Sequence, residues 1–193
     1  IKSMNLGARR YTYDELKSVG FKALGENVQI SNRASLYGVQ NISIGDNVRI
    51  DDFATIIATN ELIIGNYVTI HNYCFLGCRS GIYLDDFVTL APGVKLFSAS
   101  DDYSGKYLTG AVVPFECTRG ECGPIHIKKH AILGANSIVM PKITIDEGTS
   151  VGANSFLKKD TQAWSIYYGT PAKRIKNRNK KMLKYSCKIE VNK

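Results

Sequence analysis

Three histidines are the side chains of this chain best suited to move a proton near neutral pH. They are His71, His126 and His130. Imidazole has an ordinary pKa close to 6.5, so a histidine is the first candidate for a general base. His71 directly follows an aliphatic residue of a regular repeat described below, and we therefore expect its side chain to point outward. This makes His71 the leading candidate, the alternative being a surface or interface histidine in a stacked column.

A polar stretch, residues 98–124, supplies a second set of candidates. It reads SASDDYSGKYLTGAVVPFECTRGECGP and carries the carboxylates of Asp101, Asp102 and Glu116. A carboxylate can accept a proton or hold an ammonium group. Adjacent carboxylates in a loop can equally cap a turn. Loops of this length in a compact scaffold are usually functional or disordered, and the charged and aromatic content favours an ordered loop.

The cysteines predict no metal centre. The chain has five, an odd number, and no apolar leader typical of secretion, so we expect reduced thiols and a cytoplasmic protein. Cys74 and Cys78 could be half of a metal site, but a complete site needs matching ligands elsewhere in the chain. We interpret both as small packing residues.

The elements that must position these side chains follow from a repeat of six residues. Bulky aliphatic residues recur at Leu24, Ile30, Leu36, Ile44, Ile50, Ile56, Ile64, Ile70, Leu76, Leu84, Leu90, Leu96, Ile127, Leu133, Val139, Ile145, Val151 and Leu157. A period of six fits neither a helix nor a simple strand. It predicts an all-β solenoid of short parallel strands, in which each strand ends at a corner and stacks on the coil before it. Glycine, asparagine and aspartate between the strands suit corners.

The chain divides into three parts. Residues 1–22 form an N-terminal segment, in which Thr12 and Glu15 have the spacing of a capping box and predict a helix over about residues 12–19. The solenoid occupies 23–162, with residues 98–124 inserted as an extended loop. Residues 163–193 form a basic C-terminal segment, a terminal helix or a partly ordered tail. Positions 173–193 hold nine cations and one acid, which accounts for the whole net charge of +8.

These features together resemble the hexapeptide-repeat acyltransferases. The resemblance covers roughly residues 22–178, and its strongest pieces are the ladder, ILGANSIVMPKITIDEGTSVGANSFLKKD and YGTPAKRIKNR. It implies a left-handed parallel β-helix, a homotrimer with active sites between subunits, and acetyl-CoA as cosubstrate without a metal. The text SASDDYSG is most similar to enzymes of O-antigen and capsule (surface polysaccharide) biosynthesis. Such enzymes acetylate the amino group of a nucleotide-linked dideoxy amino sugar.

The resemblance also suggests roles for single residues. His71 matches a position that contacts the acceptor in galactoside acetyltransferases. Those relatives carry a catalytic histidine in the loop after a coil that here reads Ala91-Pro92-Gly93-Val94, and the matching position here is about Asp101. Asp101 is therefore the second catalytic candidate. Further candidates for binding the sugar substrate are Asp102, Tyr103, Arg79 and Glu116.

For the CoA donor, the resemblance points to small residues and to cations. Ala135 and Ala153 match positions whose backbone lines the pantetheine groove. Cations near the distal part of CoA, which carries phosphates, are Lys158, Lys159, Arg174 and Lys176. Lysine and arginine suit phosphate in any family. The alternative is that Lys158 and Lys159 are solvated corner residues.

Three functions stay open at this point. An N-acetyltransferase is favoured by the missing loop histidine and by the acidic SDDY, which can hold an amine. An O-acetyltransferase of a sugar or polysaccharide would rely on His71 for the harder deprotonation of a hydroxyl. A non-enzymatic scaffold would need neither the polar loop nor the terminal cations. A carbonic anhydrase of the same solenoid class, with three zinc-binding histidines, is disfavoured by the spacing of His126 and His130. No partner nucleic acid and no membrane span are expected.

Overall fold

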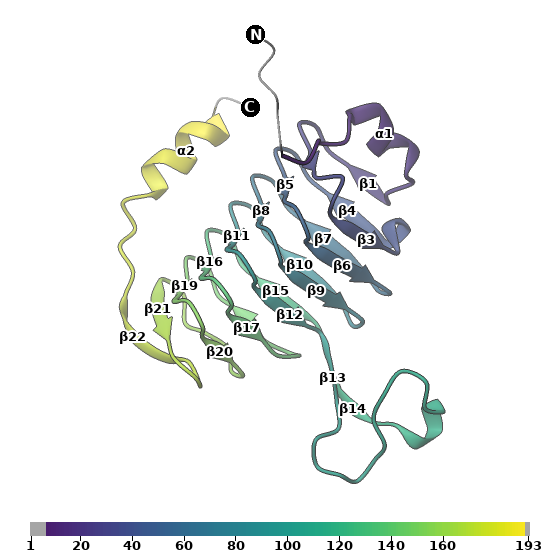
Figure 1. Ribbon diagram of the computed structural model, residues 1–193. Coiled ribbons are helices and arrows are strands. Elements are labelled where there is room, and N and C mark those ends of the chain that lie inside the picture. The colour runs from purple at the N-terminus through teal and green to yellow at the C-terminus, as the bar shows by residue number, and fades with distance from the viewer. Residues whose placement is uncertain (1–6, 192–193) are drawn as a thin grey trace.

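The computed structural model describes residues 7–191 and shows a solenoid with three faces (Figure 1). The predicted N-terminal and C-terminal segments, 1–22 and 163–193, reach into residues 1–6 and 192–193, which lie outside the described part. Each face is a sheet of short strands, one from each coil, that pair parallel and in register, and the last strand of one sheet is added antiparallel. The prediction of a parallel β-solenoid is confirmed.

The three faces take their strands in turn along the chain. Face 1 contains β1 (Ala23–Leu24), β4 (Ile42–Ile44), β7 (Leu62–Ile64), β10 (Ile82–Leu84), β15 (Ile125–Ile127) and β18 (Thr144–Ile145). Face 2 contains β2 (Gln29–Ile30), β5 (Arg49–Ile50), β8 (Thr69–Ile70), β11 (Thr89–Leu90), β16 (Ile132–Leu133), β19 (Ser150–Val151), β21 (Ser165–Tyr168) and β22 (Lys173–Asn177). Face 3 contains β3 (Ser35–Tyr37), β6 (Thr55–Ala58), β9 (Phe75–Cys78), β12 (Lys95–Phe97), β17 (Ile138–Val139) and β20 (Phe156–Leu157). A short 3-10 helix, η1 (Val39–Asn41), precedes β4.

The core contains the ladder residues that the six-residue period predicts, together with aliphatic residues outside the ladder such as Ile42, Leu62 and Ile82. All ladder residues are buried except Leu24 and Leu36, which lie half-buried in the first coil, where no earlier coil covers them. Cys74 and Cys78 are buried and free, in the same core cluster as the aliphatic residues. Their interpretation as packing residues is confirmed.

The corners differ from the prediction in one respect. Several left-handed corner positions hold aromatic residues instead of glycine or asparagine, among them Phe53, Tyr67 and Phe87. Their rings stack on the ring of the next coil, as in the pair Tyr67–Phe87 with 5.0 Å between centroids. Gly45 has no positive φ, and it is needed for space instead, because a Cβ there would lie 2.9 Å from the carbonyl carbon of Gly65.

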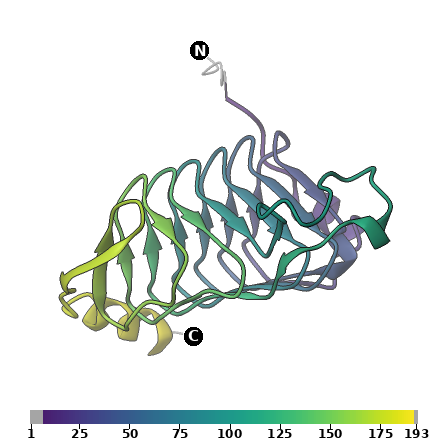
Figure 2. The ribbon, with the colours of Figure 1, turned by 90° about the horizontal axis from the view of Figure 1, so that it is seen from below.

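The insertion leaves the solenoid after β12 as a hairpin. Strands β13 (Ala99–Asp101) and β14 (Gly120–Cys122) pair antiparallel, and a 3-10 helix, η2 (Phe115–Cys117), lies between them. The hairpin projects beyond the wall of stacked coils (Figures 1 and 2).

One helix lies near each end of the chain. Helix α1 (Tyr13–Ser18) begins after Thr12, and the predicted capping box of Thr12 and Glu15 is formed. At the other end, β22 runs antiparallel to β21, and helix α2 (Leu183–Val191) folds back along the solenoid (Figure 1). Among residues 7–191, no helix has the length and apolar character that a membrane crossing requires.

Candidate functional site

An apolar groove of ≈ 810 Å³ runs along the outer surface of face 3, beside the root of the hairpin. Its floor is formed by outward side chains of successive strands, namely Ile57, Phe75, Phe97, Ile138, Met140 and Phe156. Three predicted site residues, Asp101, Tyr103 and Arg79, line it at the hairpin. The structure therefore brings one catalytic candidate and two substrate-binding candidates together along one groove.

The groove continues toward two predicted cations. Met140 and Phe156 also line a second hollow, whose other residues include Lys158, Lys159 and Glu121. Lys158 and Lys159 follow β20 directly and are exposed. A continuous track thus leads from a carboxylate at the hairpin, over aromatic and aliphatic side chains, to a pair of ammonium groups.

Asp102 and Glu116 occupy different surroundings from Asp101. The carboxylate of Asp102 accepts hydrogen bonds from the backbone N–H groups of Ser104, Lys106 and Tyr107, at 3.0 to 3.1 Å. Hydrogen bonds from Ser104 hold the pKa of Asp102 below its ordinary value. Asp102 therefore shapes the loop, the alternative that the sequence left open. Glu116 is exposed in η2 and is not among the residues that line the groove.

His71 lies on the other side of face 3, at the corner that leads into β9, whereas Arg79 lies just after that strand. Its Nδ1 atom is 3.1 Å from Oδ2 of Asp51, one coil earlier. Arg10 and Arg49 bind Oδ1 of the same carboxylate, at 2.6 and 2.7 Å. Within one chain, the structure does not bring His71 and Asp101 together.

The carboxylate of Asp51 was not among the sequence candidates. Burial acts to raise its pKa, but hydrogen bonds from Arg49 and Arg10 outweigh burial and hold the pKa below its ordinary value. A signal for Asp51 exists in the sequence, since it precedes His71 by the 20 residues of one coil. Arg10 comes from outside the repeat, and no period could have indicated it.

The edge between faces 2 and 3 changes character along the solenoid. Early coils place charged and aromatic residues there, ending with His71, Asn72 and Tyr73. In later coils the same corner consists of small residues and one proline, namely Ala91-Pro92-Gly93, Gly134-Ala135 and Gly152-Ala153. Strand register aligns these corners in one row, because Ile70, Leu90, Leu133 and Val151 pair in succession. Ala135 and Ala153 thus lie in a row of corners with small side chains, and His71 occupies the corner of the coil before that row begins.

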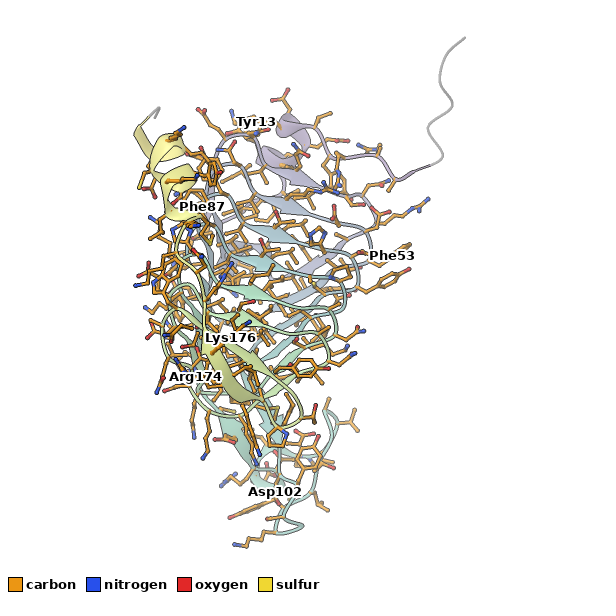
Figure 3. All side chains as sticks on the ribbon, turned by 90° about the vertical axis from the view of Figure 1, so that its left-hand side faces the viewer. Tyr13, Phe53, Phe87, Asp102, Arg174 and Lys176 are labelled. Carbon is orange, nitrogen blue, oxygen red and sulfur yellow. The ribbon has the colours of Figure 1, made fainter. Side chains whose placement is uncertain are left out.

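The two remaining predicted cations, Arg174 and Lys176, lie on β22 and do not line the groove or the two hollows beside it. The guanidinium of Arg174 is tied to Ser165 Oγ at 3.0 Å and to the side chain of Asn177. Lys176 pairs with Ile166 further along β21 (Figure 3 labels Arg174 and Lys176). Lys173, which the sequence reasoning missed, shares a hollow with Lys158 and Lys159 at the end of the solenoid.

The other two histidines stack on different aromatic rings. His126 stacks on Tyr83 on the outer surface of face 1, with 4.6 Å between ring centroids. His130 is buried at the edge between faces 1 and 2, stacked on Phe87. The three histidines of one chain therefore occupy three separate places.

The parallel β-solenoid and its groove fit the class of solenoid acyltransferases that the sequence resembles. The chain is 42% identical over 170 residues to a dTDP-4-amino-4,6-dideoxy-D-glucose acyltransferase of Escherichia coli, a match that covers 88% of each protein. The chain belongs to the hexapeptide-repeat acyltransferase family. No protein-family model matches the sequence.

Solved structures agree with this assignment. A mutant of AntD, an N-acyltransferase from Bacillus cereus in complex with dTDP and coenzyme A, superposes with a TM-score of 0.92 at 37% identity, over 96% of this chain and 100% of AntD. AntD with dTDP and 3-hydroxybutyryl-CoA gives a TM-score of 0.83 at 36% identity, over 96% of this chain and 98% of AntD.

Proposed function

We propose that this protein transfers an acyl group from a CoA thioester to the amino group of dTDP-4-amino-4,6-dideoxyglucose. The relationship to the E. coli acyltransferase, which extends over 88% of both chains, carries this proposal. The AntD complexes support it, because dTDP and CoA ligands bind to a protein of the same fold and length. We expect the acyl group to be acetyl. The alternative is 3-hydroxybutyryl, the acyl group of the CoA thioester bound to AntD.

The donor fits the groove on face 3. The apolar floor from Phe97 to Phe156 suits the pantetheine arm, and the phosphates of CoA would meet Lys158 and Lys159 at the far end. Lys173, in the adjoining hollow, adds a third cation within reach of phosphate. In this orientation the thioester points toward Asp101 at the hairpin.

The acceptor then lies beside the hairpin. The carboxylate of Asp101 can hold the ammonium form of the sugar amine, and Tyr103 and Arg79 line the same end of the groove. Tyr103 is exposed and free to stack on a sugar or nucleotide ring. Asp102 contributes by ordering the loop, as its hydrogen bonds to three backbone groups indicate.

A second copy of the chain would complete the site, and we propose a homotrimer. The outer surface of face 3 is apolar and leaves Ile57 and Tyr37 exposed, which favours burial against another subunit. The edge with Ala135 and Ala153 would cover the groove, since small residues let a backbone approach the pantetheine arm. His71 of the partner subunit would then face Asp101 across the acceptor.

The reaction in such a site is direct transfer. The amine nitrogen attacks the thioester carbon, the C–S bond breaks, and CoA leaves as the thiolate. The nitrogen gives up one proton, for which the imidazole of His71 is the proposed acceptor. The cytoplasmic location and a role in O-antigen or other surface polysaccharide synthesis remain predictions that go with this substrate.

A thiol-release assay tests the function. Purified protein receives acetyl-CoA or 3-hydroxybutyryl-CoA, with dTDP-4-amino-4,6-dideoxyglucose or its 4-hydroxy counterpart as a matched acceptor, and products are weighed by mass spectrometry. We expect thiol release and an acylated product with the amino acceptor alone. Turnover with only the hydroxy acceptor would favour an O-acyltransferase, and no thiol release with any acceptor would favour a scaffold.

A further inference from the structure

We propose that Asp51 is a positioning residue, whose carboxylate fixes the ring of His71 so that Nε2 faces the acceptor amine. This inference rests on the proposed function, in which His71 takes the amine proton. It adds a residue that comes from a different coil and whose side chain does not touch the substrate.

Both carboxylate oxygens of Asp51 are held by neighbouring side chains. The residue is only 7% exposed, at the corner between β5 and β6. Its Oδ2 accepts a hydrogen bond from His71 Nδ1–H at 3.1 Å, while Oδ1 accepts from Arg10 and Arg49. A buried carboxylate is costly unless it is fully paired, so this arrangement fixes the position of the carboxylate closely. The side chain of His71 remains 35% exposed and open to a ligand.

The charges at this corner favour an ionised carboxylate. Arg10 reaches in from the segment before α1 and also donates to the carbonyl oxygen of Ile50 at 2.8 Å. Arg49 comes from β5 of the same coil, one coil before His71. The neighbouring Asp52 is bound by Ser31 Oγ at 2.6 Å and lies 3.8 Å from Arg33. The corner in the coil after His71 reads Ala91-Pro92 and adds no ionisable group.

The chemistry follows from what each atom can do. An ionised carboxylate only accepts hydrogen bonds, so Nδ1 of His71 must carry the proton between them. Neutral imidazole then has its lone pair at Nε2. As the amine attacks the thioester carbon and CoA leaves as thiolate, the nitrogen-bound proton moves to Nε2, and the carboxylate stabilises the resulting imidazolium. Asp51 itself stays ionised throughout.

The test compares Asp51→Asn with the matched variant Asp52→Asn in the full-length protein. Asparagine keeps the size of the side chain but offers an N–H group to Nδ1, which destabilises the required tautomer. We expect Asp51→Asn to lower kcat/KM for the amino sugar by about 10²-fold, within the range typical for general-base catalysis, whereas Asp52→Asn changes it less than threefold. The double variant Asp51→Asn/His71→Ala should be no slower than His71→Ala alone, because the two residues act as a unit.

A readout independent of turnover separates this inference from the proposed function. The ¹⁵N chemical shifts of His71 should show a protonated Nδ1 and a bare Nε2 in wild type, and a mixture in Asp51→Asn. If Asp51→Asn does not fold, Arg10→Gln serves instead, because it removes one support and leaves the carboxylate. Wild-type rate, pH profile and tautomer in Asp51→Asn, or multiplicative losses in the double variant, would overturn the role of Asp51. Inactivity of wild type with every acceptor would overturn the function, while the tautomer would still report on Asp51.

Discussion

The imidazole of His130 stacks on the ring of Phe87, with 5.1 Å between their centroids and 19° between their planes. The ring of Trp164 also contacts the imidazole, tilted by 43° with 6.2 Å between centroids, and Lys129 precedes His130 in the chain. His130 is 4% exposed, and its buried Nδ1 atom has no hydrogen-bond partner among residues 7–191. Burial, followed by the charge of Lys129, lowers the pKa of His130 from its ordinary value.

This stack predicts an acid-sensitive fold. The pKa of His130 is lower in the folded state than in the unfolded chain. At a pH between these two pKa values, the unfolded chain therefore binds more protons at this histidine than the folded protein does. The free energy of unfolding should therefore fall as pH drops below about 6.5, the ordinary pKa of histidine. His130→Phe keeps an aromatic ring in the stack and should flatten this slope between pH 7.5 and 5 in denaturant titrations. An identical slope in the variant would show that another group causes the acid sensitivity.

The role of His71 predicts a catalytic loss. His71→Ala should lower kcat at least tenfold, because removing a general base typically costs about 10²–10⁴-fold. His126→Ala, on the outer surface of face 1, is the control and should retain the wild-type rate. Steady-state kinetics with the amino sugar measures both, and a wild-type rate over the whole pH profile in His71→Ala would remove His71 from the mechanism.

The cations at the end of the groove predict an effect on donor binding. Lys159→Ala should raise KM for acyl-CoA by roughly tenfold, the size of one charge-assisted hydrogen bond, and should change kcat less. Lys17→Ala at the opposite end of the solenoid, in α1, is the control. A fall in kcat with an unchanged donor KM would contradict the assignment of Lys159 to CoA phosphates.

The apolar surface of face 3 predicts an effect on assembly. Ile57 on face 3 and Ile63 on face 1 belong to successive coils and are 37% and 38% exposed. Ile57→Asp should dissociate the proposed trimer, because it places a charge in the buried interface, whereas Ile63→Asp should leave the trimer intact. Light scattering after size-exclusion chromatography measures the mass. Equal masses of the two variants would place the interface elsewhere or exclude an oligomer.

Much of the fold could be predicted from the sequence because a solenoid repeats one local pattern. The residues of the ladder, the start of the insertion near Ser98 and the capping box at Thr12 all follow from spacing alone. Lys158, Lys159 and Asp101 were also predicted from the resemblance, and the structure places Asp101 in the groove and the two lysines in the hollow that adjoins it.

Other parts of the site depend on contacts that no period encodes. Arg10 reaches Asp51 across 41 positions, and Lys173 joins Lys158 and Lys159 only because β22 folds back on β21. Arg174 stays a predicted CoA contact, and no period could have indicated that its guanidinium forms hydrogen bonds with Ser165 and Asn177. Such contacts depend on how non-repeating ends of the chain dock on the solenoid.

The sequence by itself determined which residues face the core and which coil carries each candidate, because a six-residue period fixes the direction of every side chain on a strand. Only the tertiary structure decided that His71 rests on Asp51, that His130 is buried, and that His71 and Asp101 lie on opposite sides of face 3. The physical reason is that side-chain direction is a local property of the backbone. Distances between coils, hairpin and terminal segments depend instead on packing between parts that share no repeat.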